Sequence, residues 1–273
     1  MQLMQRNCDP LVLVNADDFG CSSSVNTAIV HGFRDHLIDT CTIMANGPAF
    51  EEACEAAHAC GFASRIGLHF VLDFGVPLTE ALRREPRFCG PDGRMLLRRP
   101  GKLIRLSSSQ QRAVAAELCA QIARCRSFGL PLTHLDSHHH IHEEFGIIGV
   151  VLTAIREQGI TLVRPMQNLR RCRTLIRRMY TYAFNTALRR LRVARTQYFG
   201  SASDYLSFIS LQGGPPPNAS IELMVHPTIG PDGAIVDAGQ NISLAETVSI
   251  VSKYRRPAVL TGVPACSLSQ PCC

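Results

Sequence analysis

The segment LVLVNADDFG, residues 11–20, begins with four apolar residues and ends in two adjacent aspartates, Asp17 and Asp18. A short continuous apolar run bounded by polar residues is typical of a strand buried in a parallel sheet. Similar runs recur along the chain: TCTIMA at 40–45, RIGLHF at 65–70, ITLVR at 160–164, IELMVH at 221–226 and PAVLTG at 257–262. Stretches with helical spacing separate them, so the sequence predicts a single α/β domain with a mainly parallel sheet.

The helix expected over residues 107–129 has clear ends. It starts with serine caps at 107–109 and stops at Gly129, which Pro131 follows. These are the residues that helix start and stop rules require.

Many of the apolar runs end in an ionisable residue: Asp17 and Asp18, His69, Asp136 to His140, Arg164 and His226. In parallel α/β barrels the active site forms at the carboxyl ends of several strands. The pattern predicts a barrel-like enzyme with one composite site. The alternative is that these strands simply end in polar loops.

The composition narrows the class of protein. The chain has 273 residues, 46% of them hydrophobic, which suits one large domain over residues 1–273. Its twelve cysteines are scattered without a CxxC pair, which favours reduced thiols. The four-residue apolar run near the start is too short for a signal peptide, so we expect a cytoplasmic protein without a membrane span. The net charge of +6 does not by itself indicate nucleic acid.

The segment THLDSHHHIH, residues 133–142, holds five of the ten histidines of the chain. Imidazole suits Zn, Co, Ni and Fe, whereas carboxylate and water suit Mg and Mn. A strand that ends near Asp136 lets only one or two of these histidines reach one ion. The cluster favours a metal site, and a solvated surface tract is the alternative.

The two adjacent aspartates fit such a site. Neighbouring carboxylates at the end of a buried strand are costly unless they bind a cation or share a proton. One aspartate can then ligate an ion while the other acts as a base. A helix N-cap is the alternative for one of them, because SSSVNTAIV follows.

Two further histidines stand at strand ends. His69 lies inside the apolar run RIGLHF, where a lone histidine is more often a core residue than a ligand. His226 lies between an apolar run and Pro227, a suitable place for a general acid at the rim of a site.

Taken together, NADDFG, GLHFVLDFGVPLT, PLTHLDSHHHIH and MVHP resemble, in their order and separations, the motifs of the YdjC-like carbohydrate deacetylases. The resemblance implies a deformed TIM-like barrel that uses one divalent ion to remove an acetyl group from an N-acetylated amino sugar or short chito-oligosaccharide. It implies Asp18, His69 and His138 as metal ligands. Asp17 would be the general base and His226 the general acid. The resemblance suggests Mg, whereas the donor set also suits Zn or Co.

Four other residues are weaker candidates for contacts with substrate or for support of the ligands: Arg164, His140, Phe19 and Asp136. Arg164 either orients an acid, binds substrate or forms a structural ion pair. The chain has no tryptophan. Sugar platforms would therefore have to come from other aromatic residues: Phe19, Phe70, Phe74, Tyr198 and Phe199.

Two basic segments stand apart from these motifs. Residues 83–105 are expected to form a surface excursion, and residues 170–195, with nine arginines and no acidic residue, a basic helical insertion or lid. The second segment could contact nucleic acid, an anionic membrane or a phosphate on the substrate. Nucleic acid is not the expected partner. A homodimer also stays open.

Two other functions remain alternatives to the deacetylase. One is an inactive basic binding protein on the same barrel. The other is a metal hydrolase that acts on a non-sugar amide or a phosphoester.

Overall fold

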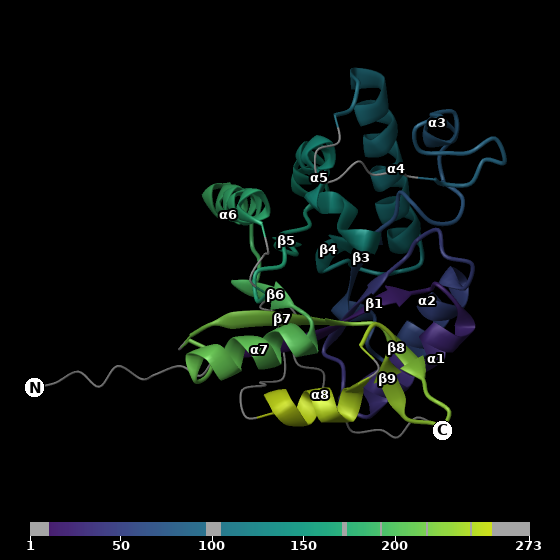
Figure 1. The fold of residues 1–273 in the computed structure, drawn as a ribbon. Coiled ribbons are helices and arrows are strands. Elements are labelled where there is room, and N and C mark those ends of the chain that lie inside the picture. The colour runs from purple at the N-terminus through teal and green to yellow at the C-terminus, as the bar shows by residue number, and fades with distance from the viewer. Residues whose placement is uncertain are drawn as a thin grey trace, which may run out of the picture.

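Seven parallel strands form one curled sheet in the computed structural model, which describes residues 11–96, 105–170, 174–191, 193–216, 218–240 and 242–252 (Figure 1). The strands are β1 (Leu11–Phe19), β2 (Thr40–Ile43), β3 (Ile66–Phe70), β4 (His134–Ser137), β5 (Leu162–Val163), β6 (Tyr198–Gly200) and β7 (Ser220–Val225). Their order is β5-β4-β3-β2-β1-β7-β6, so β1 to β5 are neighbours in chain order, β7 returns to pair with β1, and β5 and β6 are the two edge strands.

The barrel is incomplete between its edge strands β5 and β6. Loop hydrogen bonds bridge this gap: Val163 N donates to Ala194 O at 2.9 Å, and Asn168 N donates to Phe199 O at 3.1 Å. The predicted α/β fold with a deformed TIM-like barrel is therefore confirmed.

Helices connect the strands on the outside of the barrel (Figure 1). They are α1 (Ser23–Arg34), α2 (Phe50–Ala59), the 3₁₀ turn η1 (Ala63–Arg65), α3 (Glu80–Arg83), α4 (Ser108–Ser127), the 3₁₀ segment η2 (His138–Glu143), α5 (Phe145–Gln158), α6 (Leu175–Arg190), α7 (Ala202–Gln212) and α8 (Leu244–Val251). After β7, a small antiparallel sheet of β8 (Pro227–Ile229), β9 (Ile235–Asp237) and β10 (Ile242–Ser243) packs against α1.

The ends of α4 follow the signals in the sequence. Ser107 and Gln110 form a capping box, in which each side chain accepts a hydrogen bond from the backbone of the other. After the helix, Gly129 takes a left-handed φ of 78°, which glycine adopts without a steric cost. The helix predicted over 107–129 is confirmed.

The two faces of the sheet have different surroundings. In β1, Val14 and Ala16 pack in the apolar core, whereas the alternate residues Asn15 and Asp17 belong to a polar network inside the barrel. The interior side chains of neighbouring strands are also polar and buried: Thr42, His69, Asp136 and Glu222. Ordinary barrels of this class fill the same space with branched apolar residues. The polar interior positions the functional site.

The two basic segments are only partly described. The described part of 83–105 contains the end of α3 and a short bridge between Cys89 and Met95, and residues 97–104 lie outside the described ranges. Helix α6 occupies most of segment 170–195. None of the described helices is long and apolar enough to cross a membrane.

Gly67 in β3 gives a test of interior packing. A Cβ added there would lie 2.7 Å from the buried ring of His134, whereas a Cβ at Gly149 in α5 would meet open space. We expect Gly67→Ala to lower the free energy of unfolding by about 1–3 kcal/mol. Gly149→Ala should raise it by about 1 kcal/mol through helix propensity. Urea unfolding measures both, and equal effects of the two variants would contradict this packing.

Candidate metal centre and active site

A β-bulge at the end of β1 lets two adjacent carboxylates serve different parts of one site. The pairing register with β2 shifts between Ala16 and Phe19, and Asp18 has a left-handed φ of 68°. Successive side chains of a regular strand point to opposite faces, and a bulge changes that direction. Asp17 thus contacts the barrel interior, and Asp18 contacts histidines at the mouth. The N-cap alternative is wrong, because the side chain of Ser22 caps α1.

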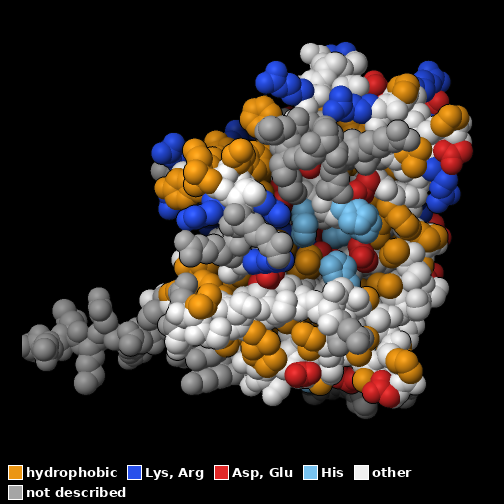
Figure 2. All heavy atoms as spheres, in the orientation of Figure 1, with side chains coloured by type: hydrophobic (Ala, Val, Ile, Leu, Met, Phe, Trp, Pro, Cys, Tyr) orange, Lys and Arg blue, Asp and Glu red, His pale blue; other side chains and the backbone are white. Residues whose placement is uncertain are grey.

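Three side chains from three strand ends meet at the mouth of the barrel. Asp18 Oδ1 lies 3.1 Å from His69 Nε2 and 3.0 Å from His138 Nδ1. Two ligands of one divalent ion lie about 3.0–3.4 Å apart when each bond is about 2.1 Å long and the angle is near 90–110°. Both distances to Asp18 fall in this range, and the donor atoms of all three residues lie within 4.8 Å of one another, so the trio could hold a metal ion. Figure 2 shows histidine side chains gathered in a hollow on this face, next to acidic groups.

The described residues contain two further groups of donors at comparable spacing. One consists of Asp73, His138 and His139, and the other of Asp17, His69 and Asp136. The first shares His138 with the mouth trio. The second already has a cation, because Arg164 contacts both of its carboxylates. The mouth trio of Asp18, His69 and His138 is the best metal site of the three.

Asp136 fixes the ring of His69. Its Oδ1 lies 2.7 Å from His69 Nδ1, which leaves Nε2 facing Asp18. Thr42 Oγ1 donates to Asp136 Oδ2 at 3.0 Å and lies 3.1 Å from His69 Nδ1. A carboxylate behind a histidine in this way sets the tautomer and raises the basicity of a metal ligand.

The charges at the mouth favour a cation. Burial raises the pKa of Asp18, but hydrogen bonds and attraction from His138 and His69 outweigh it and hold the pKa well below its ordinary value. Burial lowers the pKa of His69, but the charge of Asp136 and the hydrogen bonds that the ring donates to Asp136 and Asp18 hold it well above its ordinary value. An ionised carboxylate and a proton on its partner mark a position where positive charge is stable.

Arg164 holds the interior carboxylates together. Its guanidinium donates to both oxygens of Asp17 at 2.7 Å, while Nη1 lies 2.6 Å from Asp136 Oδ2 and Nε donates to Glu222 Oε1 at 2.6 Å. The ring of Phe199 lies 4.7 Å from the guanidinium carbon. Only 1% of the side chain is exposed and its ion pairs are to three acids, so of the alternatives for Arg164 the structure favours the orientation of acids.

The pKa values in this cluster follow from burial and from one shared cation. Burial raises the pKa of Asp136, but attraction from Arg164 and then His69 reverses the shift and lowers it. Burial raises the pKa of Glu222, and the nearby Asp136 adds to that effect against the attraction of Arg164. The cluster thus concentrates negative charge on Asp136, directly behind His69.

His226 stands at the rim, after β7. Its side chain is 36% exposed, and Nδ1 lies 3.9 Å from Oδ1 of Asp237, a buried residue of β9. The backbone N–H of Gly239 donates to that oxygen at 2.9 Å. Burial raises the pKa of Asp237, although the hydrogen bond from Gly239 and the charge of His226 act against it. His226 is thus open to solvent on one side and faces a carboxylate on the other.

The five histidines of residues 133–142 lie in different surroundings. His134 is buried, with Nε2 3.1 Å from Asn15 Oδ1. His142 is also buried, with Nδ1 2.5 Å from Ser137 Oγ. His139 is exposed and lies 2.9 Å from Asp73, and the ring of His140 lies 5.7 Å from that of Phe199. Only His138 joins the mouth trio.

The aromatic residues expected to bind sugar are mostly unavailable. Phe19 is 0% exposed and its ring packs 5.8 Å from that of Phe62, so the expectation that Phe19 contacts substrate is wrong. Phe70 and Phe199 are buried as well. Phe74 is half-buried, and its ring lies 5.7 Å from that of His138 at the mouth.

The sequence-based search missed several members of the site: Asn15, Thr42, Glu222 and Asp237. Glu222 and Thr42 are single polar residues inside apolar runs, at positions whose side chains point into the barrel. A polar residue within such a run is the signal that would have found them. Asp237 is the last residue of the short strand β9, where the sequence has no comparable signal.

Comparisons with known proteins agree with the motifs found in the sequence. The family model described as YdjC-like protein matches residues 11–259, which confirms the resemblance noted in the sequence. A carbohydrate deacetylase of Geobacillus stearothermophilus is 36% identical over 167 residues, 61% of this chain and 62% of that protein. The match thus spans less than two thirds of that relative.

Other relatives have similar names and similar sequence identities. A carbohydrate deacetylase of Brevibacillus brevis is 30% identical over 228 residues, 79% of this chain and 80% of that protein. A chitooligosaccharide deacetylase of Escherichia fergusonii is 36% identical over 156 residues, 56% of this chain and 58% of that protein. Among solved structures, a candidate cellobiose-phosphate cleavage protein of Enterococcus faecalis V583 has a TM-score of 0.63 at 18% identity, covering 92% of this chain and 88% of that one. That likeness concerns the fold alone.

The buried His134 predicts a pH dependence of stability. Burial lowers its pKa to about 4, whereas the unfolded chain titrates near 6.5. The unfolded chain therefore binds more protons between these values, so the stability contributed by neutral His134 is complete above pH 6.5 and is lost as the pH falls toward 4. The loss amounts to about 3 kcal/mol.

His134→Asn isolates this contribution from those of the carboxylates. We expect the difference in free energy of unfolding between wild type and variant to shrink by about 3 kcal/mol from pH 7 to pH 4. Urea unfolding at several pH values measures it. A difference that stays constant with pH would show that His134 has an ordinary pKa.

Proposed function

Because the chain belongs to the YdjC-like protein family, we propose that it is a metal-dependent hydrolase that removes the acetyl group from an N-acetylated amino sugar or a short chito-oligosaccharide. The names of the relatives, carbohydrate deacetylase and chitooligosaccharide deacetylase, supply the substrate class. The observation that carries the proposal is the mouth trio of Asp18, His69 and His138 beside Asp17, which Arg164 holds in place.

The donor set fits one divalent ion, held by Asp18, His69 and His138. When bound, such an ion polarises the acetyl carbonyl and makes a nearby water more acidic. Two imidazoles and one carboxylate suit Zn or Co, whereas the family resemblance suggests Mg. The metal that restores activity to the metal-stripped protein identifies the ion.

Asp17 is the proposed general base. A carboxylate offers about four lone-pair positions. Two guanidinium nitrogens of Arg164, each at 2.7 Å, and Nδ2 of Asn15, at 2.9 Å, occupy three of them. The remaining position accepts the proton of the attacking water. Because Asp17 is 2% exposed, only a molecule at the floor of the site reaches it.

His226 is the proposed general acid. Its exposed rim position allows contact with the leaving amine, which needs a proton when the carbon–nitrogen bond breaks. Oδ1 of Asp237 lies 3.9 Å from its Nδ1 and orients the ring. One proton thus passes from water to Asp17 and another from His226 to the amine, and the products are acetate and an amino sugar.

The mouth also offers contacts for a sugar. Phe74 presents a half-buried ring beside His138, and His139 stands next to it, held by Asp73. An aromatic face with polar neighbours suits one sugar ring, whose apolar face packs on the aromatic ring while its hydroxyls form hydrogen bonds.

The two alternative functions, an inactive binding protein and a hydrolase of another substrate, predict other results. An inactive binding protein has no need for a base with an arginine clamp beside three potential ligands, which argues against that alternative. Hydrolysis of a non-sugar amide or a phosphoester would use the same groups and is distinguished by substrate. The cytoplasmic location and the homodimer stay predictions.

Acetate release from N,N′-diacetylchitobiose tests the proposal. Metal-stripped protein should be inactive and regain activity with Mg, Zn or Co. Asp17→Asn should lower kcat by about 10²–10⁴-fold while metal binding is retained. Asp35→Asn, which changes an exposed carboxylate paired with Arg34, serves as the control and should leave kcat unchanged. A folded protein that binds one ion but releases no acetate from this or related N-acetylated sugars would contradict the proposal.

Asp237→Asn tests the pairing at the rim. Loss of the facing carboxylate should lower kcat about tenfold or more and leave KM nearly unchanged, since Asp237 acts through His226 rather than on the substrate. The matched control is Asp232→Asn, which alters an exposed aspartate in the adjacent turn. If Asp237→Asn lowers only the melting temperature, Asp237 has a structural role alone.

A further inference from the structure

Helix α6 has two apolar faces, and only one of them is covered. Phe184 and Leu188 on one face pack in a small core with Met166. On the other side of the helix, four large apolar side chains are exposed: Leu175 by 67%, Ile176 by 81%, Met179 by 64% and Tyr182 by 72%. Their spacing places them together over the first two turns. We call these four residues the α6 apolar face.

Arginines surround this face. A groove of about 590 Å³ runs along it and is lined by Leu175, Met179 and Tyr182 on one side. Its other lining residues are four arginines and six uncharged polar residues; the arginines are Arg170, Arg178, Arg189 and Arg195. The groove has no acidic lining residue, and within the described chain none of these arginines forms an ion pair. Burial and repulsion from Arg189 lower the pKa of Arg195, as expected where positive charges are crowded.

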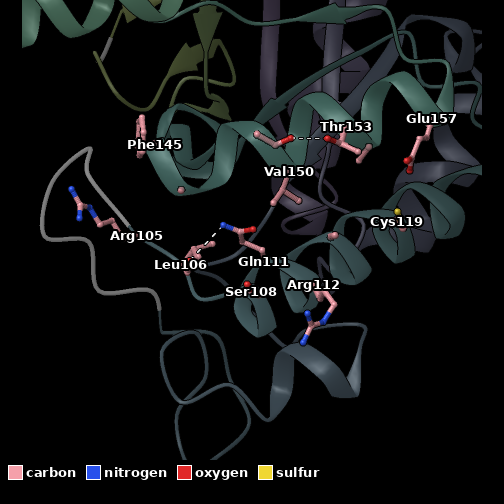
Figure 3. Close-up of a pocket in the computed structure, with 14 residues that line it drawn as sticks. Arg105, Leu106, Ser108, Gln111, Arg112, Cys119, Phe145, Val150, Thr153 and Glu157 are labelled. Carbon is pink, nitrogen blue, oxygen red and sulfur yellow. Dashed lines mark hydrogen bonds between the residues drawn. The ribbon is translucent and has the colours of Figure 1, made fainter.

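A second groove gives a comparison for the α6 groove. It is about 700 Å³ in volume and lies between α4 and α5 (Figure 3). Its lining combines Arg105 and Arg112 with Glu157, so it carries both signs of charge. Of these two grooves in the described part of the chain, the α6 groove is the one that joins uncompensated positive charge to a cluster of exposed apolar side chains.

Helix α6 is fixed beside the active site. Asn185 and Met166 form two hydrogen bonds, of 2.8 and 3.1 Å, which join the helix to the segment two residues after Arg164. The hydroxyl of Tyr180 donates to Glu143 O at 2.6 Å, in the segment that follows the histidine cluster. Figure 2 shows apolar and basic side chains gathered at the position of α6, on the face that also contains the histidine-lined hollow.

We propose that α6 docks the protein on a membrane surface that carries anionic phospholipids. The α6 apolar face enters the layer beneath the headgroups, and the arginines of the groove bind lipid phosphates. Amphipathic helices with a basic flank bind membranes through buried apolar area and attraction to anionic lipids.

The charges favour lipid over a second copy of the chain. A two-fold dimer through α6 would bring two identical sets of arginines together, and like charges in contact repel. The side chains also disfavour nucleic acid, whose bases stack on aromatic rings. Three of the four residues of the α6 apolar face are aliphatic, and Tyr182 is the exception.

Vesicle sedimentation with the full chain tests the proposal. The protein should bind phosphatidylcholine vesicles that contain phosphatidylglycerol and should bind pure phosphatidylcholine at least about tenfold more weakly. Ile176→Ser/Met179→Ser and Arg178→Ser/Arg189→Ser should each weaken binding about tenfold or more. All four side chains are largely exposed, so thermal unfolding should be unchanged.

Two matched variants serve as controls. Leu211→Ser removes an apolar side chain on α7 that is 86% exposed, and Arg34→Ser removes an exposed arginine on α1. Neither should alter binding. Absence of binding to anionic vesicles, or binding that the α6 variants do not weaken, would overturn the proposal.

Two other results would assign the surface to a different partner and would also overturn the proposal. One is a dimer in light scattering that Ile176→Ser/Met179→Ser converts to a monomer. The other is binding to duplex DNA that is stronger than binding to anionic vesicles and is lost in Arg178→Ser/Arg189→Ser.

Discussion

The site depends on one buried cation. Arg164 joins carboxylates from three strands, Asp17 of β1, Asp136 of β4 and Glu222 of β7, in a space that water hardly reaches. Without the guanidinium these acids would repel one another, and removal of one partner from a buried ion pair typically costs about 3–5 kcal/mol. The same contacts orient Asp17 and hold Asp136 behind His69. Stability of the barrel and geometry of the site therefore rest on the same residue.

The bulge at Asp18 separates the functions of two neighbouring residues. In a regular strand, one of Asp17 and Asp18 would point away from the site. The left-handed backbone at Asp18 brings its carboxylate to the two histidines at the mouth, while Asp17 stays with Arg164. A base and a metal ligand can thus be adjacent in sequence without competing for one cation.

The sequence predicted the residues of the site that follow one recurring pattern, an ionisable residue at the end of an apolar run. Polar residues at strand ends predicted one composite site that includes Asp18, His69 and His138, because parallel strands bring their carboxyl ends together, and the family resemblance implied these three as the metal ligands. It did not predict Glu222 or Thr42, since only the closed sheet reveals which strand positions face inward. The burial of Phe19 was not predicted for a related reason. The bulge determines which side of β1 Phe19 faces, and no residue pattern predicts the bulge. Asp237 meets His226 only through the turn between β8 and β9.

A crystal soaked with Mn²⁺ or Co²⁺ and examined by anomalous diffraction tests the central claim most directly. The account predicts one ion per chain, about 2.0–2.3 Å from Asp18, His69 Nε2 and His138 Nδ1, with both oxygens of Asp17 still on Arg164. An ion bound instead by Asp73, His138 and His139, or one that draws Asp17 away from Arg164, would contradict it.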